Sequence, residues 1–289
     1  MSAEHLTNTD LHIAGLHVRV SCMAEACVAG IRALTALFEM YKGGGSPALH
    51  FRLETSSRAI QLTCNGEYIW QGEEPGEVVA AFEWAFYNRT IDRLYPRLIS
   101  LHAASVKWYG HGITIAGRSG AGKSSLCTAA LLDGASYFSD EYSLLGTAGL
   151  ITPFPRPLQW GGESHPAFSL QAMRDSGLFG EARYSFTDRD NQAVTSLLWH
   201  PAKLAGKEKE MELLLMPRFD AAAQDVQCEA LPRSQALMEL AAEMHHKLPV
   251  AERLRELHRR IPQHLRIHRL IFSDVHRAWG TVKALLAGD

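Results

Sequence analysis

The chain has 289 residues, of which 46% are hydrophobic and 21% are charged, with a formal net charge of -2. This composition is typical of a folded globular protein and excludes the fibrous and disordered classes. A net charge this close to zero creates no long-range field to attract nucleic acid or an anionic membrane, so neither is expected as a partner.

The cysteines and the first residues bear on where the chain works. Its five cysteines show no metal-ligand spacing, and an odd number does not suit full disulfide pairing, so we expect free and mostly buried thiols. The polar segment 1–10 lacks the basic and then apolar layout of a signal peptide. The sequence has no run of about 18 apolar residues, so no membrane span is predicted. The expected location is therefore the cytoplasm.

The first part of the chain, residues 1–96, is predicted to form a small α+β domain, for which substrate binding is a candidate role. Apolar and polar residues alternate over 16–21, which is the period of a half-buried strand. Two apolar runs farther on flank Asn65-Gly66, a dipeptide that tolerates the positive φ angles of a tight hairpin turn. These patterns predict a strand followed by a β-hairpin.

A helix is predicted over residues 77–94, where apolar residues recur at helical spacing before Tyr95-Pro96. Its aromatic residues include Trp84 and Tyr87. We expect them to pack in the core or at a domain interface, because burying large aromatic area is their usual role.

From residue 97 onward the pattern changes to strand, loop, helix and strand, so we expect a second, α/β domain over 97–289. The segment 123–132 is a predicted helix that Gly134 caps. The basic stretch 253–269 also contains acidic residues and is interpreted as a solvated helix face. Strands are predicted at 98–106, 112–116, 135–139, 211–216 and 266–272, and further helices at 234–246 and 274–286.

The string GITIAGRSGAGKSS, residues 112–125, matches the phosphate-binding template of glycine, four residues, glycine, lysine and serine. It lies between a predicted strand and a predicted helix, as that template requires. Gly117, Gly120 and Gly122 allow the backbone turns that aim successive amides at phosphate oxygens. The following helix adds its N-terminal amides and the positive end of its dipole. A glycine-rich turn without a ligand is disfavoured, because both the pattern and its context agree.

Side chains of the loop complete a predicted site for ATP and Mg²⁺. Lys123 supplies a positive charge near the β- and γ-phosphates, and the Ser124 hydroxyl is suited to coordinate the metal. The sequence has neither the Asn-Lys-x-Asp motif of GTPases nor the Leu-Ser-Gly-Gly-Gln signature of transporter ATPases, so a kinase fits best. The predicted nucleotide-binding residues are Gly117, Ser119, Gly120, Ala121, Gly122, Lys123, Ser124 and Ser125.

Three pieces of the segment 101–145 occur in a characteristic order. His102 lies in a strand with the sequence LHAA, the loop GRSGAGKSS follows, and Asp140-Glu141 closes the next predicted strand in FSDE. Together they resemble the C-terminal catalytic domain of HPr kinase/phosphorylase and its related proteins. The resemblance implies a P-loop kinase domain similar to phosphoenolpyruvate carboxykinase, here preceded by the small α+β domain.

The resemblance also implies roles for individual residues. Asp140 is the expected general base on the acceptor hydroxyl and, with Ser124, a metal ligand; a carboxylate beside Mg²⁺ and the γ-phosphate fits that chemistry on physical grounds as well. Lys123, Glu141 and His102 complete the candidate catalytic residues, with His102 touching a phosphate or orienting the acidic pair. The structural alternatives are a capping role for Asp140 and a core role for His102.

Positions at which this sequence differs from the HPr kinase pattern bear on the identity of the acceptor. Arg118 and Ser125 stand where HPr kinases carry Asp and Glu, so HPr itself is not the expected substrate. Similar relatives are serine kinases encoded beside peptide-modification systems, which implies a Ser or Thr hydroxyl of a peptide or small protein as acceptor. A small-molecule kinase acting on a sugar, amino acid or alcohol and a non-enzymatic ATP-dependent binding module remain open. The family forms rings of subunits, which leaves a homo-oligomer open too.

Arginines and histidines elsewhere in the sequence are further candidate site residues. Arg156 and Arg218 are candidates for clamping a phosphoryl group, because a guanidinium donates two hydrogen bonds at once. Both lie in proline-bounded segments, and a surface role is the preferred interpretation. Neighbouring histidines, His245-His246 and His264 with His268, are interpreted as exposed residues rather than a metal site, since a closed site needs three or four ligands.

Overall fold

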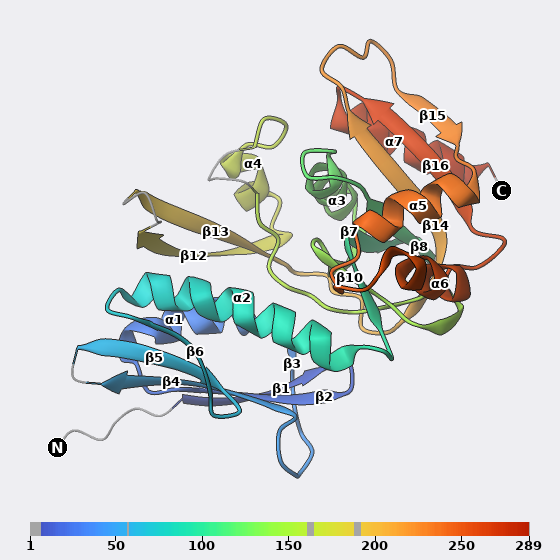
Figure 1. Cartoon of the computed structure of the whole chain (residues 1–289). Helices are drawn as coiled ribbons and strands as arrows, with labels where there is room; N and C mark the ends of the chain where they lie inside the picture. Colours follow the sequence, from blue (N-terminus) through green and yellow to red (C-terminus); the bar gives the residue numbers. More distant parts are fainter. Residues whose placement is uncertain (1–6, 57, 161–164, 188–191, 289) are drawn as a thin grey trace. The chain divides into compact units, whose positions relative to one another are not determined.

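The computed structural model describes residues 7–56, 58–160, 165–187 and 192–288 (Figure 1). It is a mixed α/β structure that divides into two compact units. The segment 181–200 belongs with the first unit, whereas the sequence predicts a single cut after residue 96. None of the described helices combines the length and apolar character that crossing a bilayer requires. The first unit comprises Met1–Leu94, Gly161–Glu163 and Glu181–His200, and the second comprises Tyr95–Trp160, Ser164–Gly180 and Pro201–Asp289.

Among its described residues, the first unit contains a six-stranded sheet in the order β3-β1-β2-β4-β5-β6. Helices α1 (Glu25–Thr35) and α2 (Pro75–Leu94) lie over one face of this sheet (Figure 1). A two-stranded sheet of β12 (Phe179–Thr187) and β13 (Ala193–Pro201) belongs to the same unit. The six strands are β1 (Thr7–Ile13), β2 (Leu16–Cys22), β3 (Glu39–Met40), β4 (Leu49–Ser56), β5 (Ala59–Cys64) and β6 (Glu67–Gly72).

Local sequence patterns account well for these elements. The predicted strand at 16–21 is β2, and the predicted hairpin is the antiparallel pair β5–β6. Its turn residues Asn65 and Gly66 have φ angles of 53° and 83°, the left-handed conformation that this dipeptide tolerates. The predicted helix over 77–94 is α2.

The aromatic residues of α2 have two different surroundings. Phe82 packs edge-on against Phe51 of β4 with ring centroids 5.7 Å apart, and the Tyr87 hydroxyl donates to the Leu34 carbonyl at 3.1 Å. The packing prediction is therefore confirmed for Tyr87. Trp84 is 67% exposed, so it does not pack in the core of the first unit.

The second unit is built on a larger sheet in the order β11-β10-β7-β8-β14-β16-β15, with β9 paired to β7. β8, β14 and β16 run parallel, so their carboxyl ends meet at one edge, while β7 runs antiparallel to β8. The strands are β7 (Ile99–Trp108), β8 (His111–Ala116), β9 (Ser136–Ser139), β10 (Tyr142–Leu145), β11 (Leu150–Thr152), β14 (Lys209–Phe219), β15 (Gln227–Ala230) and β16 (Arg266–Phe272).

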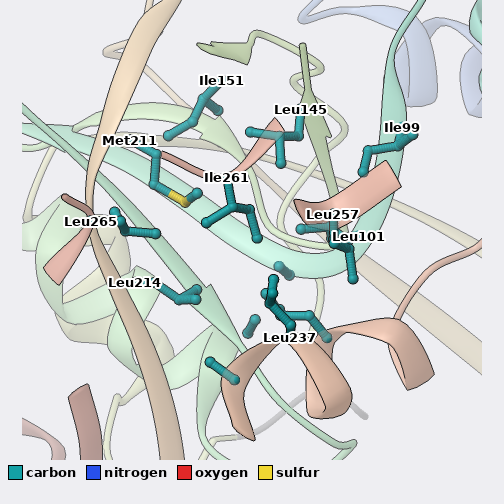
Figure 2. Close-up of a cluster of buried hydrophobic side chains, with 14 of the residues drawn as sticks. Ile99, Leu101, Leu145, Ile151, Met211, Leu214, Leu237, Leu257, Ile261 and Leu265 are labelled. Carbon is teal, nitrogen blue, oxygen red and sulfur yellow. The ribbon is translucent and has the colours of Figure 1, made fainter. Parts of the chain in front are cut away.

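Helices cover this sheet and enclose its core. Figure 2 shows strand residues such as Leu101 and Leu214 in one cluster with Leu237 of α5 and Leu257 of α6. Helices α3 and α7 pack against each other and against β7, β8 and β16. The cluster anchors the strands that carry the candidate site. The helices are α3 (Lys123–Leu132), α4 (Leu170–Asp175), α5 (Arg233–Ala242), α6 (Val250–Arg260) and α7 (Val275–Ala287).

Two predictions for the second unit need correction. The helix predicted over 234–246 ends at Ala242, because the residues beyond it pair with β7 instead of continuing the helix. The basic stretch is only partly solvated: Arg260 of α6 is buried and donates to the Pro96 and Arg97 carbonyls and to Glu256. The cysteine prediction is confirmed, since all five are free and all but Cys228 are buried.

Candidate active site

The loop between β8 and α3 follows directly from its glycines. Gly120 and Gly122 have φ angles of 77° and 98°, in the left-handed region that favours glycine. A side chain at Gly122 would also meet the Phe272 ring, because an added Cβ would lie 2.6 Å from its Cζ. The amide of Ala121 donates to the Arg118 carbonyl at 3.1 Å, which closes the turn. Both strain and space therefore select glycine at residue 122.

The loop leads into the N-terminus of α3, where Gly122 is the N-cap and has no capping side chain. The first amides of a helix have no acceptor within the helix, and its dipole places partial positive charge at this end. Ser119 and Gly120 lie exposed at the loop's outer side. Such a strand-loop-helix junction has the amide donors and the charge that an anion such as phosphate needs.

Lys123, the first residue of α3, is buried with only 6% of its surface exposed. Its Nζ donates to the carbonyls of Gly117 and Arg118 at 2.7 and 3.2 Å. Burial lowers the pKa of Lys123, while the charges of nearby carboxylates oppose this shift. The positively charged Nζ of Lys123 therefore lies against the backbone of the loop.

Ser125, in the first turn of α3, contacts a histidine. The Ala167 amide donates to His165 Nδ1 at 3.0 Å, which leaves the ring proton of a neutral His165 on Nε2. That nitrogen lies 2.8 Å from Ser125 Oγ and donates to it. The hydroxyl hydrogen of Ser125 is therefore available to another acceptor.

Asp140 follows the last residue of β9 and is 3% exposed. The Ser124 hydroxyl is its hydrogen-bond partner, yet Oδ1 has no partner among the described residues. Burial raises the pKa of Asp140 to about 6, although the nearby positive charge of Arg156 acts in the opposite direction. A buried carboxylate oxygen without a donor is costly unless a ligand satisfies it.

Glu141, the next residue, lies in the opposite environment. Its Oε1 is 3.0 Å from His102 Nε2. Burial would raise the pKa of Glu141, but the hydrogen bond from His102 and the charges of Arg156 and His102 outweigh it and lower that pKa to about 2. The bond to Glu141 in turn raises the pKa of His102, against the effect of burial. Adjacent carboxyl groups are thus tuned in opposite directions.

A second carboxylate, Glu243, holds the other side of the His102 ring. Its Oε2 lies 3.1 Å from His102 Nδ1, so both ring nitrogens face acidic groups and both donate when the ring is protonated. Glu243 follows the last residue of α5, and its carbonyl accepts the His102 amide at 2.7 Å. Sequence patterns gave no sign of Glu243, because only pairing between distant segments brings it to His102.

That pairing occupies the edge of β7 beyond the end of β8. β8 ends at Ala116, which lies opposite Ala103 of β7. The residues of β7 before Ala103 pair instead with the segment that follows α5. Leu101 and Met244 form an antiparallel bridge, and the His245 amide donates to the Ser100 carbonyl at 3.1 Å. The segment 243–246 therefore lies beside the start of the loop.

The histidines of this segment are not the exposed pair that the sequence predicts. His246 is buried, and its Nε2 accepts the Ser100 amide at 3.0 Å. His245 Nδ1 contacts Ser100 Oγ at 3.0 Å, and burial together with the charge of His102 lowers the pKa of His245 to about 4. They are structural partners of β7. In the described part of the chain, no group of three His, Cys, Asp or Glu side chains is arranged to hold a metal by itself.

The two candidate arginines differ from one another. Arg156 is buried, bonds Gln159 Oε1 at 2.5 Å, and lowers the pKa of both Asp140 and Glu141 by its charge, so the surface interpretation is wrong for it. Arg218, at the end of β14, is exposed and borders a cavity beside the loop. The structure thus brings five predicted residues together with Arg156 and Glu243. The five are His102, Lys123, Ser124, Asp140 and Glu141.

Comparisons with known proteins add one finding. No family model matches the chain, and no curated protein matches it. Among solved structures, the chain is similar to the HPr(Ser) kinase/phosphatase from Coxiella burnetii, with 13% sequence identity and a TM-score of 0.27. The match covers 65% of this chain and 94% of that one.

Proposed function

We propose that this chain is an ATP-dependent kinase that transfers the γ-phosphoryl group to a serine or threonine hydroxyl of a peptide or small protein. The observation that carries the proposal is the buried Asp140 carboxylate beside the loop, one oxygen of which has no donor among the described residues. Such an oxygen is suited to receive the proton of an incoming hydroxyl.

The loop supplies the other half of the reaction. The amides between Gly117 and Gly122 and those of the first turn of α3 bind the phosphates, and Lys123 turns from the loop carbonyls to their oxygens. Ser124 and Asp140 are the residues that would hold Mg²⁺, and their oxygens suit it, with phosphate and water oxygens as the remaining ligands. The bound ion would neutralise phosphate charge.

In the proposed transfer, one bond to the γ-phosphorus forms as another breaks. The acceptor oxygen forms a bond to the γ-phosphorus while its proton passes to Asp140, and the bond from that phosphorus to the bridging oxygen of ADP breaks. Lys123 and Arg156 offset the negative charge that is shared among the phosphoryl oxygens. The ion pairs of His102 keep Glu141 ionised and fixed next to Asp140.

An open sheet edge supports a peptide rather than a metabolite as acceptor. In the described part of the first unit, β6 ends the sheet order, and its Tyr68 and Trp70 are exposed. Such an edge accepts an extended peptide as an added strand, with backbone hydrogen bonds supplying the affinity.

The decisive experiment is incubation with γ-labelled ATP, Mg²⁺ and candidate peptides encoded nearby, followed by mass spectrometry of the acceptors. We expect phosphoserine or phosphothreonine with the wild type and none with Asp140→Asn. Phosphorylation of a sugar, amino acid or alcohol alone would overturn the peptide acceptor. ATP-dependent partner binding without turnover, equal in both proteins, would show a binding module instead.

A further inference from the structure

A cavity of about 600 Å³ adjoins the loop on the side of β14. The backbone from Gly117 to Ala121 forms one wall, and the end of β14 with Arg218 and Phe219 forms another. We propose that this cavity receives the base and ribose of the nucleotide whose phosphates the loop binds. The inference rests on the proposed function and assigns the part of the ligand that the loop motif does not address.

The order of strands favours the nucleoside over the acceptor as occupant. β8, which carries the loop, lies between β7 and β14. Asp140 follows β9, which pairs with β7, whereas the cavity lies toward β14 and Asp140 does not line it. In phosphoryl transfer the attacking and leaving oxygens are roughly in line, so the leaving nucleotide extends away from the base. The acceptor therefore belongs at Asp140 and the nucleoside in the cavity.

Phe219 offers a surface for the base. It is the last residue of β14 and is 50% exposed, and it lines the cavity. Its amide donates to the Ala121 carbonyl at 3.1 Å, and its ring stands edge-on to Phe272 with centroids 6.1 Å apart. The ring is thus held in place beside the loop, as an aromatic platform for stacking a base must be.

The charges of the cavity suit a sugar joined to phosphates. Arg118 and Arg218 are exposed and have no acidic partner within the described ranges, so both remain able to bind an α-phosphate or stack on a base. Arg269 pairs with Glu239 Oε1 at 2.6 Å. Gln235 Nε2 donates to the same oxygen at 3.2 Å, so both of these donors bind Oε1 rather than Oε2. A carboxylate so placed can accept a ribose hydroxyl.

The test compares two ligands, ATP and inorganic tripolyphosphate, by isothermal titration calorimetry in the presence of Mg²⁺. Tripolyphosphate occupies only the loop, whereas ATP also reaches the cavity. For Phe219→Ala we expect ATP affinity to fall about tenfold, as loss of a stacking ring typically causes, with tripolyphosphate affinity unchanged. The ATP affinity of Phe219→Leu, which keeps apolar bulk but loses the ring, should fall by a similar factor. The control is Tyr109→Ala, an exposed aromatic residue at the opposite end of β8.

Other outcomes separate the two proposals. Unchanged affinity for both ligands in both Phe219 variants would overturn the cavity assignment and leave the proposed function standing. An equal loss for both ligands would also overturn it, because Phe219 would then support the loop rather than the nucleoside. If the wild type bound neither ATP nor tripolyphosphate, the proposed function itself would fail and the inference with it.

Discussion

Each unit of the molecule contains a histidine bound to a carboxylate, and the two clusters differ in what they leave open. In the first unit, His17 Nε2 lies 2.6 Å from Asp10 Oδ1, and Arg19 binds both oxygens of Asp10 at 2.8 and 3.2 Å. The His17 ring stacks on Tyr41 with centroids 4.0 Å apart. Every oxygen of that carboxylate is therefore occupied, and the cluster joins β1 to β2.

The second cluster has a similar centre but a different neighbour. His102 is held by Glu141 and Glu243, and the adjacent Asp140 retains an oxygen without a partner in the described structure. Ion pairs between histidine and carboxylates are therefore common to both clusters and do not by themselves mark a functional site. The first cluster also has a buried polar atom without a partner among the described residues, His17 Nδ1. What distinguishes the second cluster is that its unpartnered atom is a carboxylate oxygen and lies beside the amide donors of the loop and of α3.

The strongest way to break this comparison is Asp140→Asn. We expect kcat to fall about a thousandfold while ATP affinity is kept, since the amide cannot take up the proton. Turnover is measured by phosphate incorporation and binding by calorimetry. Asp133→Asn is the matched control, because Asp133 lies at the other end of α3, where it binds Trp108, Trp279 and Lys283. Full turnover in Asp140→Asn would mean that the free oxygen has no chemical role.

Lys123→Met tests the positive charge at the start of α3, beside the loop amides. The side chain keeps similar bulk but loses its charge, so we expect kcat/KM for ATP to fall about a hundredfold. Steady-state kinetics measures the effect, and circular dichroism checks that the fold survives. Unaltered kinetics in a folded variant would contradict the role of the loop.

Glu243→Gln sharpens the comparison by removing one of the two charges around His102. Glu243 acts through His102 as a positioning residue, so we expect kcat to fall about tenfold with little change in KM for ATP. The pKa of His102, followed by NMR, should fall as well, because the Glu243 charge raises it. Glu243→Asp should recover part of the activity. A variant with normal kcat and an unshifted His102 would remove Glu243 from the site.

Asp10→Asn is the counterpart in the first unit, with the smallest expected effect. The hydrogen bond from Arg19 lowers the pKa of Asp10 despite partial burial, so ionised Asp10 stabilises the fold above its unfolded pKa of 3.8. That stabilisation is lost as the pH falls through the lowered, folded pKa. We expect a Tm about 2 °C lower at pH 7, a gap that closes in acid, and unchanged kinase activity. A gap that stayed constant down to pH 2 would contradict the assignment to the Asp10 charge.

Sequence patterns were sufficient where structure is locally determined. The glycine template predicted the turn, and the segment 123–132 is helical as expected, because both depend on neighbouring residues. The burial of Arg156 and the contact of Glu243 with His102 depend on segments far apart in the chain, for which periodicity carries no signal.

The pairing of segment 243–246 with β7 has a consequence for biosynthesis. His102 and Glu243 are separated by 141 positions, so the ribosome must release most of the polypeptide before these partners can meet. A nascent chain that ends before residue 243 therefore contains the glycine-rich turn and Glu141 but lacks the second carboxylate that holds His102. The full set of contacts around His102 therefore forms only late in synthesis.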